Sequence, residues 1–139
     1  MKISKLSFAT ERVNLKQGDQ CGNYLAFYFF IDGKKIDSDD YNPANCWDIL
    51  DERAQERNLV VLAHCGCGVW ECSSLIAKCR PVSDNVVEWT VDEYRCERDP
   101  QKFYFDKSEY NKVLAELTSA AQDEKKKCMK ISAHIKARL

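Results

Sequence analysis

The pattern of hydrophobic and polar positions predicts two strands at the start of the chain. A short apolar series over residues 3–8 predicts the first strand. The second is predicted over residues 23–31, where the nearly continuous apolar run indicates a strand covered on both faces. Asp32-Gly33 is a tight-turn pair, and residues 34–36 are predicted to form a short return arm.

A helix is predicted after the return arm. Asn42-Pro43 has the residue types favoured at a helix N-cap and at the first helical position. Trp47, Leu50 and Ala54 then fall on one face at helical spacing. We therefore expect a single helix that ends near residue 57 and places Trp47 in the core.

The middle of the chain predicts a meander of strands. Val87, Trp89 and Val91 alternate with polar residues, which is typical of a half-buried strand. Compact apolar segments precede this strand, and aromatic residues follow it. The predicted strands cover residues 59–63, 74–80, 87–91 and part of 94–105.

The last predicted element is a helix that begins at Asp106 and Glu109, which are spaced as a capping box. Its apolar stripe is formed by Tyr110, Val113, Leu114, Leu117 and Ala121. Strands and helices in this order predict an α+β fold. We expect one domain over residues 1–123, with an antiparallel or mixed sheet of about five or six strands and two helices packed on it. A basic extension follows over residues 124–139.

Composition narrows the class of protein without naming a function. The 139 residues are 45% apolar and 31% charged, which is typical of a globular domain and excludes disorder for the whole chain. The formal net charge is −1, so bulk charge indicates neither a membrane partner nor direct nucleic-acid binding. No apolar run reaches the roughly 20 residues that a membrane span requires.

Charge is nevertheless uneven along the chain. Residues 37–56 hold seven acidic side chains against one basic side chain, and residues 124–139 hold six basic against one acidic. Such segments are often solvated surface, but an acidic patch around an exposed aromatic residue also suits capture of a basic protein. The candidate contacts are Asp39, Asp40, Tyr41, Asp48, Asp51, Glu52 and, at a turn where it would be exposed, Trp70.

The eight cysteines are the compositional outlier. The first residues of the chain contain no apolar core of a signal peptide, so we expect a cytoplasmic protein with reduced thiols rather than a disulfide scaffold. Four cysteines lie close together in the sequence: Cys65, Cys67, Cys72 and Cys79.

These four cysteines have three interpretations. Thiols are small hydrophobic groups that are often buried in strands, and this is the favoured interpretation. Tetrahedral zinc takes four nitrogen or sulfur ligands, so a zinc site or a redox site is the alternative, although C-x-C is not the usual zinc-binding spacing. A nucleophilic Cys65 with His64 as its base comes third, because no third group that would orient the base can be named.

Sequence motifs add a resemblance but no activity. The segments AHCGCGVWEC, NVVEW and FYFDKSEY resemble a scattered group of small bacterial proteins with a C-x-C-G-x-x-x-C core, over roughly residues 59–117. This resemblance implies no catalytic or binding residue. Nucleotide-binding, zinc-protease and serine-hydrolase motifs are absent from the sequence.

By size and charge layout alone, the chain also resembles bacterial toxin-immunity proteins. That resemblance implies a non-enzymatic cytoplasmic inhibitor that masks the active site of a basic toxin domain, such as a nuclease. The alternative is a zinc-binding or redox protein that uses the four clustered cysteines, and no other cofactor is expected.

Overall fold

Two β-sheets and three helices make up the parts of the chain that the computed structural model describes, which are residues 1–17, 20–36, 40–94 and 99–137. The larger sheet contains six strands in the spatial order β1 (Ile3–Ser4), β9 (Gln101–Asp106), β8 (Val86–Tyr94), β7 (Ser74–Pro81), β6 (Leu59–His64) and β5 (Asn42–Pro43). The smaller sheet contains β2 (Leu6–Gln17), β3 (Gln20–Ile31) and β4 (Lys34–Ile36) in that order.

The strand pairing confirms the predicted α+β class. β1 pairs with β9 in parallel, and the other neighbours in the six-stranded sheet are antiparallel, so the sheet is mixed. The smaller sheet was not expected as a separate unit. Its first strand extends well beyond the apolar series of residues 3–8, because β2 pairs with β3 along its whole length, from Leu6 opposite Ile31 to Gln17 opposite Gln20.

The predicted tight turn lies between β3 and β4. Asp32 and Gly33 have φ angles of 53° and 79°. Two successive residues with positive φ are the backbone of the turn that best matches the twist of antiparallel strands. Asp32 also accepts a hydrogen bond from the backbone N–H of Lys5 at 2.9 Å, which ties this turn to the junction of β1 and β2.

The single helix predicted after residue 42 is wrong. Asn42-Pro43 forms β5 at the sheet edge, and two short helices follow, α1 (Cys46–Ile49) and α2 (Glu52–Glu56). Asn45 caps α1 and Asp51 caps α2, which interrupts the helical periodicity between them. Trp47 is consequently 49% exposed instead of buried, and its ring lies 5.1 Å from the ammonium group of Lys125.

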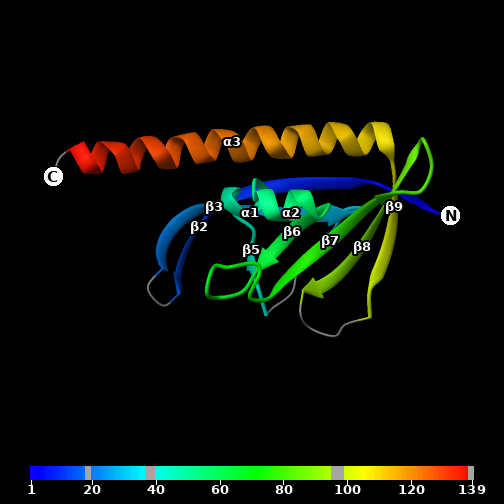
Figure 1. Ribbon diagram of the computed structural model, residues 1–139, viewed down its shortest axis with the longest axis horizontal. Coiled ribbons are helices and arrows are strands. Elements are labelled where there is room, and N and C mark those ends of the chain that lie inside the picture. Colours follow the sequence, from blue (N-terminus) through cyan, green and yellow to red (C-terminus); the bar gives the residue numbers. More distant parts are fainter. Residues whose placement is uncertain (18–19, 37–39, 95–98, 138–139) are drawn as a thin grey trace.

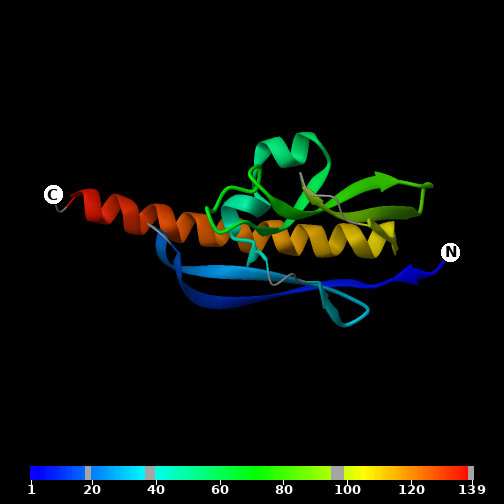
Figure 2. The same ribbon diagram turned by 90° about the horizontal axis from the view of Figure 1, so that it is seen from below.

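The third helix, α3 (Lys107–Ala137), lies along both sheets, and its C-terminal end extends beyond them (Figures 1 and 2). Asp106 caps it, as predicted, by accepting a hydrogen bond from the backbone N–H of Glu109 at 3.1 Å. The predicted boundary at residue 124 falls inside this continuous helix. At that position the buried carboxylate of Glu124 binds both terminal nitrogens of Arg12 in β2, at 2.6 and 2.9 Å.

The main core lies where the two sheets meet α3. Its centre is Trp89 of β8, which is completely buried, as predicted. The indole packs edge-on against Phe105 of β9 and Tyr110 of α3, and its N–H donates to the Tyr110 hydroxyl at 3.0 Å. No helix in the described part of the chain combines the length and the apolar character needed to cross a membrane.

Candidate metal centre

Three thiols come together in the loop between β6 and β7. The sulfur atoms of Cys65, Cys67 and Cys72 all lie within 4.8 Å of one another, and we call these three residues the thiol cluster. The sulfurs of Cys65 and Cys67 are 2.8 Å apart. Cys67 and Cys72 are exposed and Cys65 is partly exposed, so the thiol cluster opens to solvent.

Local hydrogen bonds explain why the loop brings these thiols together. The N–H of Cys65 donates to the carbonyl of Ser73 at 3.0 Å, which closes the loop at its base. Two tight turns follow, with Gly68 donating to the carbonyl of Cys65 and Cys72 donating to the carbonyl of Val69. Gly68 has a φ angle of 83°, a conformation that glycine adopts at little cost.

Trp70 anchors this loop instead of meeting solvent. It is only 3% exposed, so its prediction as an exposed partner contact is wrong. The loop folds back so that the indole packs into a second hydrophobic cluster with Leu59, Val61 and Ile76, and its ring centre lies 5.3 Å from that of Tyr94. Among the described residues, the buried indole N–H has no hydrogen-bond partner.

The thiols of the loop differ in acidity. Hydrogen bonding from the side chain of Cys67, and then from its backbone, lowers the pKa of the Cys65 thiol below its ordinary value. Hydrogen bonding to Cys65 and Cys67 raises the pKa of Cys72 to about 11. Cys65 is therefore the first of these two to ionise, and ionised sulfur is the form that binds metals or attacks other groups.

Cys79 does not join the thiol cluster, so the predicted set of four cysteines is wrong in one member. β7 is extended, and it carries Cys79 five residues beyond Ser74, a distance of about 16 Å at the usual rise per residue. Cys79 is half-buried against the core, where its sulfur accepts a hydrogen bond from the Tyr110 hydroxyl at 3.4 Å. This contact fits the structural interpretation of that thiol.

His64 and Asp48 form a buried pair that the sequence interpretation missed. The Nδ1 atom of His64 lies 2.6 Å from a carboxylate oxygen of Asp48, and both side chains are nearly inaccessible. The same oxygen accepts the backbone N–H of Asn45 at 3.0 Å. Asp48 is therefore not a surface contact, and its prediction as a partner-binding residue is wrong. The spacing Asn45-x-x-Asp48 was the available signal, because it is a capping box.

His64 does not belong to the thiol cluster, although it directly precedes Cys65 in the sequence. Neither of its ring nitrogens lies within 4.8 Å of all three sulfur atoms. The structure thus pairs this imidazole with a buried carboxylate. The charge of His64 is the smallest of the influences on the lowered pKa of Cys65, and no hydrogen bond between described residues joins it to that thiol.

The other predicted partner contacts are only partly on the surface. Asp39 lies outside the described residues, whereas Asp40 and Glu52 are exposed. Tyr41 is partly buried, and its hydroxyl is hydrogen-bonded to the Ser73 hydroxyl at 2.8 Å.

Asp51 has a local structural role. It is partly buried, and its carboxylate accepts the backbone N–H of Ala54 at 3.0 Å, which caps α2. A change at Asp51 therefore alters the helix as well as the surface charge.

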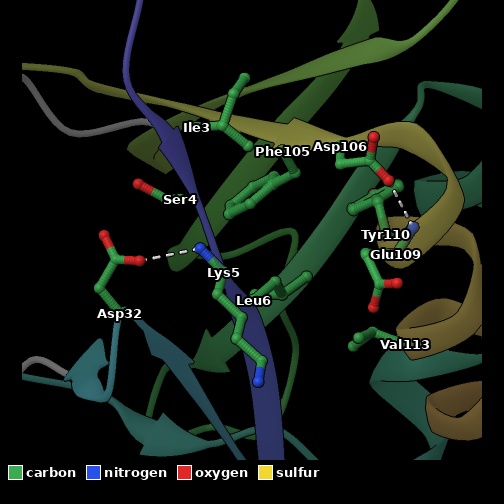
Figure 3. A pocket seen from close by; sticks show the side chains of 10 residues that line it. All are labelled: Ile3, Ser4, Lys5, Leu6, Asp32, Phe105, Asp106, Glu109, Tyr110 and Val113. Atoms are coloured by element: carbon green, nitrogen blue, oxygen red, sulfur yellow. Dashed lines mark hydrogen bonds between the residues drawn. The ribbon is translucent and has the colours of Figure 1, made fainter.

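A separate pocket of about 410 Å³ lies between β1, β9 and the start of α3 (Figure 3). Phe105 and Leu6 supply apolar lining, and the carboxylates of Asp32, Asp106 and Glu109 also line the pocket. Asp32 and Asp106 are already bound to backbone N–H groups, and Glu109 lies 3.6 Å from the ammonium group of Lys112. The pocket is therefore a cavity that lacks the convergent, available polar groups by which a ligand site is identified.

Comparison with known proteins adds no further assignment: no family model matches this chain, and no curated protein or solved structure shows significant similarity to it. The thiol cluster is therefore interpreted from its own geometry and chemistry.

Proposed function

We propose that this protein binds a thiophilic metal ion through Cys65, Cys67 and Cys72. The observation that carries the proposal is the approach of all three sulfur atoms to within 4.8 Å of one another. Around one zinc ion with bonds of about 2.3 Å, tetrahedral geometry separates sulfur ligands by about 3.8 Å. The thiol cluster meets this requirement with small adjustments of the side chains.

A metal explains the third thiol better than redox chemistry does. A dithiol needs only two sulfur atoms, one that attacks and one that resolves. In this loop a third thiol, Cys72, lies beside Cys65 and Cys67. A bound cation would favour the ionised form of all three thiols together.

The test is metal analysis of protein purified under reducing conditions. We expect one metal ion per chain after separate loading with zinc and with copper(I) and removal of the excess, with at least one of the two ions retained. The Cys65→Ser/Cys67→Ser variant should lose that ion. The matched control is Cys79→Ser/Cys128→Ser, which removes two thiols from outside the thiol cluster and should retain the ion. Equal metal content in the two variants for both ions contradicts the proposal.

We infer, as a second candidate function, a toxin inhibitor that uses its acidic surface. The favouring observation is that Glu52 and Glu56 are exposed and that Asp40, which is also exposed, adds acidic charge to the same region. Charge reversal at Glu52 and Glu56 leaves the cap of α2 in place. We expect it to weaken capture of a basic nuclease domain and to reduce the salt dependence of binding. Unchanged binding and an unchanged salt dependence would contradict a role for the acidic surface in partner binding.

A further inference from the structure

We propose that the thiol cluster binds copper(I) as a three-coordinate, exchangeable ion and is not a structural zinc site. This inference rests on the proposed metal-binding function and specifies its ligand. Three observations lead to it: the number and type of the donor atoms, the way in which the loop is held, and the exposure of the sulfurs.

The donor set consists of three sulfurs. Structural zinc sites are almost always closed by four protein ligands. Within the described residues, the group of potential ligands contains Cys65, Cys67 and Cys72 and no histidine or carboxylate. Soft thiolates bind both copper(I) and zinc, so the number of ligands decides between the two ions. Copper(I) is satisfied by three sulfur ligands, whereas a structural zinc site takes a fourth protein ligand.

The neighbouring polar side chains are engaged elsewhere. Glu71 lies within the loop, but its carboxylate accepts a hydrogen bond from Arg53 of α2 at 2.8 Å. His64, which directly precedes Cys65, contacts Asp48 at 2.6 Å. The carboxylate and the imidazole that flank the cysteines in the sequence therefore have other partners, which supports three-coordination.

The fold itself holds the loop, so a metal is not needed to organise it. The buried Trp70 packs against hydrophobic residues of β6 and β7, and the base of the loop is closed between Cys65 and Ser73. A structural zinc contributes folding energy to a segment that lacks such contacts. In this protein that contribution comes from apolar burial, and the thiols remain available for a bound ion that can leave.

Exposure of the sulfurs favours exchange. Cys67 and Cys72 are exposed and Cys65 is partly exposed, so an incoming thiolate from another molecule can reach the metal from the solvent side. Each thiol loses its proton on binding, and the ion and three thiols give a three-thiolate complex plus three protons with no change of oxidation state. An open site with three sulfur donors suits delivery or buffering of the ion.

The experiment is anaerobic titration of the full chain with copper(I) in competition with a copper(I)-specific chromophoric chelator, followed by X-ray absorption spectroscopy. We expect one copper per chain with three sulfur neighbours. Cys72→Ser should lower the copper(I) affinity roughly 100-fold, which corresponds to about 2.7 kcal/mol, and should leave two sulfur neighbours. Cys79→Ser is the matched control and should bind copper(I) as the wild type does.

The outcomes separate this inference from the proposed function. Copper(I) held by two sulfurs, with an affinity that Cys72→Ser leaves unchanged, overturns three-coordination. One zinc ion held by three sulfurs and a nitrogen or oxygen ligand, with loss of folding stability when it is removed, overturns the inference but leaves the metal-binding function standing. No specific binding of either ion, relative to a variant in which all three cysteines are serine, overturns both.

Discussion

The same substitution, tryptophan to phenylalanine, can be compared at two buried positions. Trp70 and Trp89 are 3% and 0% exposed, and each packs among aliphatic and aromatic side chains. They differ at the indole N–H. In Trp89 it donates to the Tyr110 hydroxyl at 3.0 Å, and in Trp70 it has no partner among the described residues.

The contacts of each tryptophan determine how much free energy of unfolding we expect to be lost when it is replaced with phenylalanine. Both variants lose about 40 Å² of buried ring surface, which is worth about 1 kcal/mol. Trp89→Phe also loses a hydrogen bond, so its total cost should be about 2–3 kcal/mol. Trp70→Phe removes a buried donor whose lack of a partner costs about 1–2 kcal/mol, so its net effect should be near zero.

The assay is urea unfolding followed by far-ultraviolet circular dichroism, with the free energy of unfolding obtained by linear extrapolation. Far-ultraviolet detection avoids the change in tryptophan fluorescence that the substitutions themselves cause. We expect Trp89→Phe to be less stable than Trp70→Phe by about 2–3 kcal/mol. A difference below about 0.5 kcal/mol would falsify the reasoning, because the two indole N–H groups would then be energetically equivalent.

Three further predictions concern charge, thiols and the backbone. The hydrogen bonds from Arg12 lower the pKa of Glu124, so the free energy of unfolding gained from this pair is fully present above about pH 4.3 and is lost as the pH falls through the pKa of Glu124 in the folded state. Glu124→Gln should therefore lower the free energy of unfolding by about 2 kcal/mol at pH 7 and by much less at pH 3, as measured by urea unfolding. In metal-free protein at pH 7, peptide mapping should find Cys65 alkylated faster than Cys72, and equal rates would contradict the assigned pKa directions. Gly33→Ala should destabilise the domain by about 1 kcal/mol in the same assay, because φ is +79° at this position, and an unchanged stability would show that the turn relaxes.

Local signals in the sequence predicted much of the fold. The turn at Asp32-Gly33, the strand around Trp89 and the cap at Asp106 each depend on neighbouring residues alone, and the structure confirms all three. The helix after Asn42 was misplaced because two capping residues compete there. Asn45 has its box partner Asp48 at the right spacing, and Pro43 is tolerated at the edge of a sheet.

The thiol cluster was predictable only in part. The sequence brings Cys65, Cys67 and Cys72 within eight positions, and a tight loop keeps them together. Burial of Trp70 depends on Tyr94 and Ile76, which come from later strands. The exclusion of Cys79 follows from the extended strand β7, which the sequence did predict, whereas its contact with Tyr110, 31 positions further along, joins distant segments. Contacts between distant segments leave no local pattern, so they could not be inferred from the sequence.

The parallel pairing of β1 with β9 has a consequence for synthesis of the chain. Ile3 lies opposite Tyr104, so this two-residue strand has no partner until about 100 further residues have been synthesised. The β2–β3 hairpin that follows it needs only local contacts and can form early. Until β9 is made, the backbone N–H and C=O groups of residues 3–4 lack their sheet partner and are open to pairing with a neighbouring chain.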